Sequence, residues 1–354
     1  STADKAVDNS GALVNNGTFT GTGKFTNETS GTFTNSKTYS PTGAVTNDGT
    51  ANFIGGGTDA TLTSFTNNGT LNVKANTTVK VAAAGTLTNN ADKTINIESG
   101  STLEVAGTLS NAGTVVNKGT LLNDATGKID VLDKGIISNK GTVTNNGTPS
   151  PSAGVYVENG GTLNNDLTYT NNGYFFVDQN GSFNQNGDFT DNGTSDIYGV
   201  FVQNGNWTIA ATYNNYAKLT INKPAVVTVA STGTLNNYNG IIVNEGGTLD
   251  NKGTVESFGK TSTNPKSLTL TGFITNNGTL TNEAAANLKN DAGSTFTNNS
   301  SLFTNPGTFT NEGAFINTAK TFTNVGTLTN QSSGTVSNTG ELANSGTLNN
   351  NATA

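Results

Sequence analysis

The sequence contains no cysteine, no histidine and no methionine, and all 17 of its basic residues are lysine. Without cysteine no disulfide can form, so packing and hydrogen bonds must stabilise the fold. Without cysteine and histidine, the usual catalytic triads and soft-metal sites are excluded. The rival class is a β-helix polysaccharide lyase or hydrolase that works with carboxylates. Such lyases usually add an arginine or lysine and such hydrolases a histidine, and of these three residues only lysine is present. We therefore expect no enzyme activity and no cofactor.

Charge is also scarce, since charged residues make up 12% of the chain and the net charge is −7. A nucleic-acid-binding protein would carry a basic stripe, and none is present. No run of 18 apolar residues occurs, so we expect no membrane insertion. The chain opens Ser1-Thr2-Ala3 without methionine, which is typical of a mature protein after signal-peptide removal. These features predict an extracellular or cell-surface protein.

What the sequence does have is a short repeat. Glycine occurs 44 times, and the C-terminal third repeats Gly-Thr-(Leu/Phe/Val)-x-Asn, as in residues 307–311. Each apolar centre is followed by asparagine two places later, at steps of about six to eight residues. The centres that we expect to form a core ladder are Leu280, Leu288, Phe296, Phe303, Phe309, Phe315, Phe322, Leu328, Val336, Leu342 and Leu348.

This pattern predicts an all-β fold, a parallel β-helix or β-solenoid with roughly three strands per coil. In a strand the apolar centre points inward and the flanking threonines point outward. One such strand cannot bury its apolar face, but coils stacked in parallel can. Glycine and asparagine suit the corners, where asparagines in register are expected to form amide ladders. The ladder residues are Asn282, Asn290, Asn298, Asn305, Asn311, Asn317, Asn324, Asn330, Asn338, Asn344 and Asn350.

A second form of the unit places one polar residue between two apolar residues, as in Leu71-Asn72-Val73 and Ile95-Asn96-Ile97. We interpret these units as longer strands on a wider face. If three units make a coil, the chain holds roughly fifteen coils. The repeat runs almost throughout, which predicts a single solenoid over residues 1–354.

Residues 150–230 differ, because they are rich in aromatic side chains. The repeat blurs between Asp188 and Pro224, which predicts a loop, a flap or a kink in this irregular segment. Trp207, Tyr213 and Tyr216 are candidate ligand contacts, since aromatic rings with a polar group suit sugars; the alternative is that they fill a wider core or staple a loop.

The acidic residues that come closest to a metal-binding cluster are Asp188, Asp191 and Asp196, in the irregular segment. These three carboxylates are a candidate calcium site, and the alternative is three solvated turn residues. The tripeptide Asn-Gly-Thr is also a glycosylation acceptor. It occurs at Asn16, Asn68, Asn146, Asn192 and Asn277. Because the corner chemistry generates the same tripeptide, the motif alone is poor evidence for glycans.

The string Asn-Gly-Thr-Leu-Thr-Asn at residues 277–282 resembles the passenger regions of bacterial autotransporter and haemagglutinin-type surface adhesins. The resemblance lies in the repeat and extends over most of the chain. It implies a right-handed β-helix that is secreted and displayed at the cell surface. It also implies adhesion, with surface glycans or a host surface as the partner.

Three functions remain open at this point. The repeat continues close to both ends without a capping element, and an open parallel edge is self-complementary. We therefore predict a subunit of an extracellular filament that stacks head to tail with copies of itself. The alternative is the adhesin. A minor alternative is an ice-binding protein, because Thr-x-Thr pairs such as Thr308/Thr310 point outward, although we expect the pairs on several faces.

Overall fold

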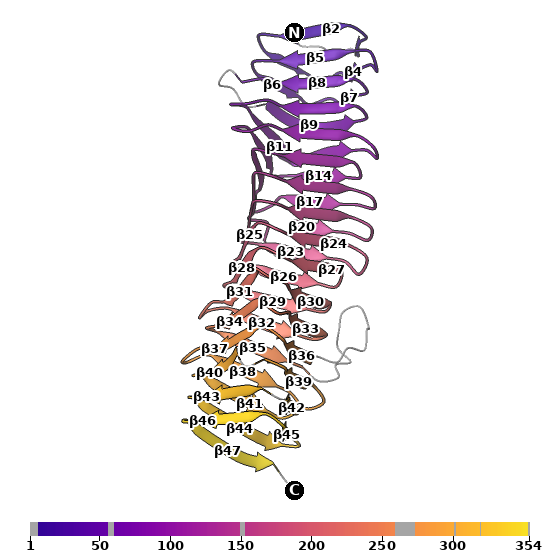
Figure 1. Cartoon of the computed structure of the whole chain (residues 1–354). Coiled ribbons are helices and arrows are strands. Elements are labelled where there is room, and N and C mark those ends of the chain that lie inside the picture. Colours follow the sequence, from indigo (N-terminus) through magenta and orange to yellow (C-terminus); the bar gives the residue numbers. More distant parts are fainter. Residues whose placement is uncertain are drawn as a thin grey trace. The chain divides into compact units, whose positions relative to one another are not determined.

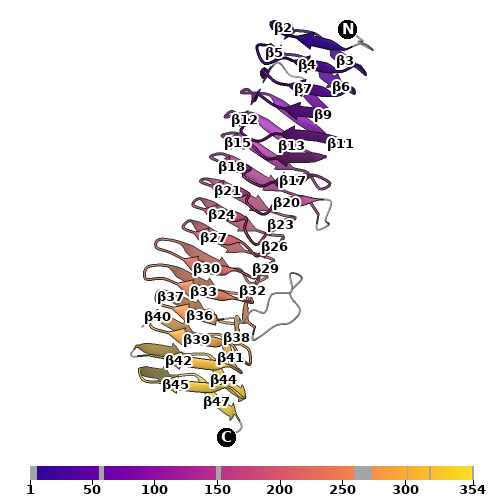
Figure 2. The same ribbon diagram turned by 90° about the vertical axis from the view of Figure 1, so that its right-hand side faces the viewer.

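The computed structural model describes residues 6–55, 60–148, 153–258, 273–300, 302–318 and 320–352. Every element assigned in these ranges is a β-strand, which confirms the predicted all-β class. The described residues include no helix that is long and apolar enough to cross a membrane. The chain forms two compact units, residues 1–183 and residues 184–354. Each unit is a β-solenoid of stacked parallel strands (Figures 1 and 2).

Unit 1 (residues 1–183) has three strands per coil, and each strand pairs in parallel with the corresponding strand of the next coil. We number the three faces of the coil in chain order. Face 1 contains β2 (Ala12–Asn15), β5 (Thr32–Asn35), β8 (Thr50–Phe53), β10 (Thr70–Val73), β12 (Thr94–Ile97), β15 (Thr114–Asn117), β18 (Ile136–Asn139) and β21 (Thr162–Asn165). These eight strands mark eight coils.

Faces 2 and 3 of unit 1 follow the same rule. Face 2 contains β3 (Phe19–Gly21), β6 (Tyr39–Pro41), β13 (Thr102–Val105), β16 (Thr120–Asn123), β19 (Thr142–Asn145) and β22 (Thr168–Asn171). Face 3 contains β1 (Val7–Asn9), β4 (Phe25–Asn27), β7 (Val45–Asn47), β14 (Thr108–Asn111), β17 (Lys128–Val131), β20 (Gly154–Val157) and β23 (Tyr174–Val177). The long strands β9 (Ala60–Asn67) and β11 (Thr78–Asn89) continue from face 2 into face 3.

Unit 2 (residues 184–354) also has eight strands on face 1. They are β24 (Ser182–Gln185), β27 (Val200–Gln203), β30 (Lys218–Ile221), β33 (Gly240–Val243), β36 (Phe273–Asn276), β39 (Thr295–Asn298), β42 (Ala314–Asn317) and β45 (Thr335–Asn338). The first of these, β24, begins two residues before the unit boundary.

The other two faces of unit 2 repeat this arrangement. Face 2 contains β25 (Asp188–Asp191), β28 (Asn206–Ile209), β31 (Val226–Val229), β34 (Thr248–Asn251), β37 (Thr279–Asn282), β40 (Leu302–Asn305), β43 (Thr321–Asn324) and β46 (Glu341–Asn344). Face 3 contains β26 (Thr194–Ile197), β29 (Thr212–Asn215), β32 (Thr234–Asn237), β35 (Thr254–Ser257), β38 (Asn287–Asn290), β41 (Thr308–Asn311), β44 (Thr327–Ser332) and β47 (Thr347–Ala352).

Most strands have four residues, of which the second and fourth point into the core. In β41, Phe309 and Asn311 are buried while Thr308 and Thr310 are partly exposed. Because side chains alternate across a strand, one period places an apolar residue and an asparagine inside. The strands pair in register, so residues of the same kind stack in successive coils. Phe309, for example, pairs with Leu328 of β44 in the next coil.

The interpretation of a wider face is wrong. The second form of the unit makes strands of the same length, such as β10 and β12, and differs only at the fourth position, where an aliphatic residue replaces asparagine. The corner that follows such a strand is usually longer too, although it has only two residues after Val105, Ile197 and Ile209. After Val131 it has four residues, contains Lys134 at φ 61°, and closes with a bond from Gly135 N to Leu132 O of 2.9 Å.

A fourth-position asparagine can stabilise a two-residue corner, although it also precedes four-residue corners, as after Asn123. After Asn311 only Glu312 and Gly313 precede the next strand, and Asn311 Nδ2 donates to Gly313 O at 3.1 Å. The side chain thus bonds the corner from inside, which valine cannot do. Glycine is needed at such corners because the coils approach closely. A Cβ added to Gly326 would collide with the carbonyl oxygen of Gly307 in the coil before.

The expected loop, flap or kink between Asp188 and Pro224 is not found. Strands β25 to β30 continue through residues 188–221 with the same alternation of buried and exposed side chains. The repeat blurs in the sequence because the inward positions carry different residues there. Trp207 and Tyr213 replace leucine at the second position, and Gln203 replaces asparagine at the fourth.

Candidate functional site

The predicted core ladder lies inside unit 2 over most of its length. Eight of the residues are at most 2% exposed: Leu280, Leu288, Phe296, Phe303, Phe309, Phe315, Phe322 and Leu328. The remaining three belong to β45, β46 and β47, each of which pairs only with a strand of the preceding coil. Val336 is accordingly 39% exposed, Leu348 is 47% exposed, and Leu342 is partly exposed.

The predicted asparagines form three hydrogen-bonded columns, each running along one face. In every step Nδ2 donates to Oδ1 of the next coil, at 2.6–2.9 Å. The columns are Asn276–Asn298–Asn317–Asn338 on face 1, Asn251–Asn282–Asn305–Asn324–Asn344 on face 2, and Asn290–Asn311–Asn330–Asn350 on face 3. These amides fix the corners, so their role is structural.

Trp207 and Tyr213 lie in the core and cannot contact a ligand. Their exposed fractions are 1% and 0%, and their ring centroids are 4.5 Å apart. Both occupy the second, inward position of a strand. They therefore fill the core, as the alternative to a ligand contact predicted. Tyr216 differs, because it follows β29 directly and lies on the outer corner, partly exposed.

The three aspartates do not converge on one point. Asp188 is exposed at the start of β25, Asp191 is fully buried at its end, and Asp196 is partly exposed on β26. Asn214 Nδ2 donates to Asp196 Oδ1 at 2.6 Å. Within the ranges that the structure describes, no group of three or more histidine, cysteine, aspartate or glutamate side chains is placed to hold a metal ion. The calcium site is therefore not formed by these residues.

The threonine pairs and the glycosylation acceptors are spread around the coil. The pairs lie on β39 (face 1), β43 (face 2), and β41 and β44 (face 3). A flat ice-binding plane would need them in one column. The acceptor asparagines are exposed or half-buried corner residues that join outer amide contacts, as where Asn172 Nδ2 donates to Asn146 Oδ1 at 2.9 Å.

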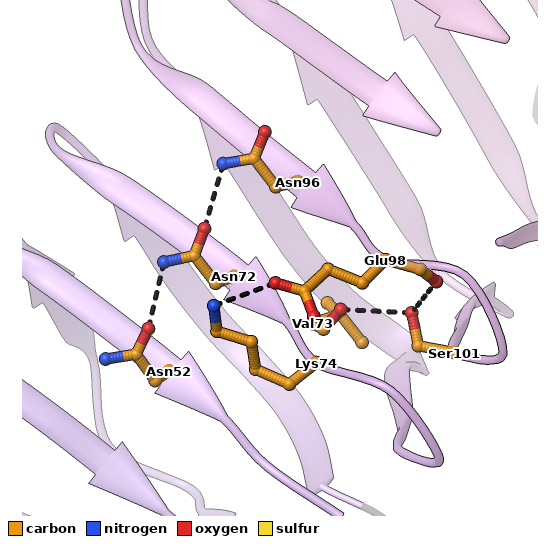
Figure 3. Close-up of polar contacts among 7 residues, drawn as sticks. All are labelled: Asn52, Asn72, Val73, Lys74, Asn96, Glu98 and Ser101. Carbon is orange, nitrogen blue, oxygen red and sulfur yellow. Dashed lines mark hydrogen bonds and ion pairs between the residues drawn. The ribbon is translucent and has the colours of Figure 1, made fainter. Parts of the chain in front are cut away.

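A groove on face 1 of unit 1 gathers polar side chains from three successive coils. Asn72 on β10, Asn96 on β12 and Val116 on β15 occupy the third, outward position and lie in register. Asn72 Nδ2 donates to Asn52 Oδ1 at 2.9 Å, and Asn96 Nδ2 donates to Asn72 Oδ1 at 2.8 Å (Figure 3). This outer amide ladder ends at Val116, which has no polar atom to continue it.

The corner after each of these strands supplies a charge. Lys74, Glu98 and Lys118 directly follow β10, β12 and β15, and they line the same groove of about 280 Å³. Lys74 Nζ lies 2.8 Å from Glu98 Oε1 (Figure 3). The corner beneath is held by the buried Ser101, whose Oγ lies 3.0 Å from Val73 O and 2.6 Å from Glu98 O and has one hydrogen to donate to these carbonyls. We call the hollow that these side chains line the face 1 groove.

Two groups in the face 1 groove keep unused hydrogen-bonding capacity. Among the contacts of the described chain, Asn96 Oδ1 accepts no hydrogen bond and Lys118 makes no ion pair. Lys118 is exposed, and Asn96 is half-buried. An ammonium group, an amide oxygen and the Lys74–Glu98 pair thus surround an open hollow floored in part by Val116. The groove offers donors and acceptors without a nucleophile, so it suits binding.

A second outward feature, missed in the sequence, is a column of rings on unit 2. Tyr198, Tyr216, Tyr238 and Phe258 each follow a face 3 strand directly. Successive ring centroids are 4.3, 4.7 and 4.6 Å apart, with interplanar angles of 6°, 9° and 9°. We call this the tyrosine stack. The rings cover one another's faces, so a sugar has no free face to stack on between them.

Burial, with a smaller contribution from the carboxylate of Asp196, raises the pKa of Tyr216 to about 12. Burial also raises the pKa of Tyr198 and of Tyr238. A phenol whose pKa is raised on folding contributes stability that is complete below pH 10 and is lost as the pH rises through the folded value. We therefore expect unit 2 to be stable up to about pH 10 and to weaken between pH 10 and 12.

An alkaline titration tests this expectation. Phenolate absorbance should lag behind that of free tyrosine, and the fluorescence of Trp207, the one tryptophan of the chain, should change in the same pH range. The variant Tyr216→Phe removes one titrating phenol from the stack and should move the transition to higher pH. A titration that follows free tyrosine in the native chain would contradict the prediction.

The fold and its outer faces define a β-solenoid protein with a polar outer surface. No protein-family model matches the sequence. No curated protein matches it either. Among solved structures, the chain is similar to the crystal structure of a TibC-catalysed hyper-glycosylated TibA55-350 fragment. That alignment covers 98% of this chain and 97% of the other at 16% identity, with a TM-score of 0.28.

Proposed function

We propose that the chain is a non-catalytic, extracellular β-solenoid of the adhesin type, which binds acidic glycans at its outer surface. The observation that supports this function is the face 1 groove, where an amide ladder ends beside an unpaired lysine. The Lys118 ammonium suits a sugar carboxylate, and Asn96 Oδ1 suits a sugar hydroxyl. Charge-assisted bonds of this kind are about twice as strong as neutral ones.

The charge of the groove favours an acidic sugar over a neutral one. Glu98 already neutralises Lys74 at 2.8 Å, so Lys118 leaves one net positive charge in the hollow. The chain as a whole carries −7, which repels a polyanion at long range. Binding should therefore be weak, local to the groove and reduced by salt.

Binding to a uronic-acid oligosaccharide tests the proposal. The Lys118→Ala variant should bind it about tenfold more weakly, which corresponds to about 1.4 kcal/mol. Calorimetry measures this, with a neutral glucan oligosaccharide as the probe that should not bind. Lys37→Ala is the matched control, since Lys37 is also an exposed corner lysine of unit 1 but does not line the groove. Equal binding by Lys118→Ala and the native chain would exclude this site.

Two parts of the sequence-based hypothesis stay predictions. Head-to-tail assembly into a filament is tested by electron microscopy of the purified chain at high concentration, where monomers alone would contradict it. The absence of enzyme activity is proposed from the chemistry of the chain, because the face 1 groove pairs its one carboxylate with a lysine. Release of new reducing ends from the uronic-acid oligosaccharide would contradict a purely binding role.

A further inference from the structure

The tyrosine stack has a geometry that a packing role does not require. Three phenols lie in one outer column, with ring planes parallel within 6° and 9° and centroids 4.3 and 4.7 Å apart. Elsewhere the described outer surface has one other close pair of tyrosines, Tyr156 and Tyr174 in unit 1, whose rings are 5.7 Å apart and tilted by 59°. Phe258, which carries no hydroxyl, ends the column at 4.6 Å from Tyr238.

The column is also open to solvent at its edge. Tyr216 and Tyr238 are partly exposed, and Tyr198 is 7% exposed. An oxidant can therefore reach Tyr216 and Tyr238 from solvent, whereas Tyr198 is largely buried and is held against Tyr216 by the stacked ring faces. The spacings of 18 residues from Tyr198 to Tyr216 and 22 from Tyr216 to Tyr238 place each ring on a separate coil.

We propose that Tyr198, Tyr216 and Tyr238 form a site of oxidative tyrosine cross-linking, which joins neighbouring coils of unit 2 through dityrosine. The oxidant is hydrogen peroxide acting through a peroxidase. Each of two phenols loses one electron and its hydroxyl proton and becomes a phenoxyl radical. The radicals couple through the ring carbons next to the oxygens, and each ring then moves its carbon-bound hydrogen to oxygen. The two electrons and two protons reduce one hydrogen peroxide to two waters.

Parallel stacking favours this coupling, because the new carbon–carbon bond forms between two ring faces that are already in contact. The fold holds the two rings next to each other, so the radicals need not meet by diffusion. A covalent link between coils would also supply what the chain cannot obtain from disulfides, since it has no cysteine. Burial raises the pKa of these phenols, so they are neutral at ordinary pH and each must lose a proton on oxidation.

Mild oxidation of the purified full chain with horseradish peroxidase and hydrogen peroxide tests the proposal. We expect dityrosine fluorescence without an increase in chain mass on denaturing gels. Peptide mass spectrometry should show links between Tyr198 and Tyr216 and between Tyr216 and Tyr238. The cross-linked chain should unfold at higher urea concentration, as reported by Trp207 in unit 2.

Matched variants separate this site from the other tyrosines. Tyr216→Phe keeps the stacked ring but removes the central phenol, so both links should be lost. Tyr198→Phe should abolish one link and keep the other. Tyr174→Phe, in the tilted pair of unit 1, should leave the fluorescence unchanged. Links found only between chains, or an equal yield from Tyr216→Phe, would overturn the proposal.

Discussion

Replacement of Phe309 by alanine should destabilise unit 2 by about 4 kcal/mol, the range measured for phenylalanine truncation in a packed core. Phe309 is fully buried, and its ring centroid lies 5.1 Å from that of Phe315 and 5.5 Å from that of Phe296. Its removal leaves a cavity that rings of adjacent coils cannot fill without losing their own contacts. The effect should appear as a lower urea midpoint and as faster hydrogen exchange in β41 and β44.

Two controls isolate the cause of this loss. Phe309→Leu keeps most of the volume and should cost less than about 1.5 kcal/mol. Val325→Ala removes an apolar side chain that is 53% exposed and should leave the midpoint within about 0.5 kcal/mol of the native chain. If Phe309→Ala behaved like Val325→Ala, the inward orientation of the ring would be wrong.

Replacement of Asn311 by alanine should cost about 3 kcal/mol, because it leaves several buried groups without partners. Asn311 Nδ2, which has two hydrogens to donate, lies 2.7 Å from Asn330 Oδ1, 3.1 Å from Gly313 O and 3.0 Å from Thr335 O. Its Oδ1 accepts from Asn290 Nδ2 at 2.7 Å. Alanine restores none of these contacts at the two-residue corner that follows Asn311.

The outer amides provide the matched control for this prediction. Asn299 directly follows the inner Asn298 and also takes part in amide contacts, donating to Asn277 Oδ1 at 2.9 Å, but it is exposed. Asn299→Ala should change the unfolding free energy by less than about 0.5 kcal/mol, since water replaces the lost bond. Equal urea midpoints for the Asn311 and Asn299 variants would show that the inner column does not stabilise the corners.

The fold was predictable because its period is short and regular. An apolar residue between threonines fixes which side faces inward, and an asparagine two places later falls on the same side. That reasoning identified the residues around Phe309 and Asn311. It did not identify the fourth position as interchangeable between asparagine and an aliphatic residue, because the two forms of the unit were taken for strands of different length. The aromatic middle was misread because large rings such as Trp207 hide the repeat in the sequence, although they fill ordinary inward positions.

The candidate sites were not predictable from local pattern. The face 1 groove depends on which outward residues meet across coils of unequal length, and Asn72, Asn96 and Val116 are separated by 24 and 20 residues. The tyrosine stack likewise joins residues 18 to 22 places apart. One signal was available, since each stacked ring directly follows a fourth-position residue. Using it requires the coil register, which a single sequence with variable corners does not supply.

The register of the coils is tested most directly by pairs of introduced cysteines, because the chain has none of its own. Thr310 and Thr329 are outward partners on neighbouring strands, whereas Thr310 and Thr323 lie on different faces. Neighbouring strands are about 4.8 Å apart, which is within reach of a disulfide. Under mild oxidation Thr310→Cys with Thr329→Cys should close an intrachain disulfide, and Thr310→Cys with Thr323→Cys should not. The reverse outcome would contradict the stacked solenoid on which the core, the amide columns and both outer sites depend.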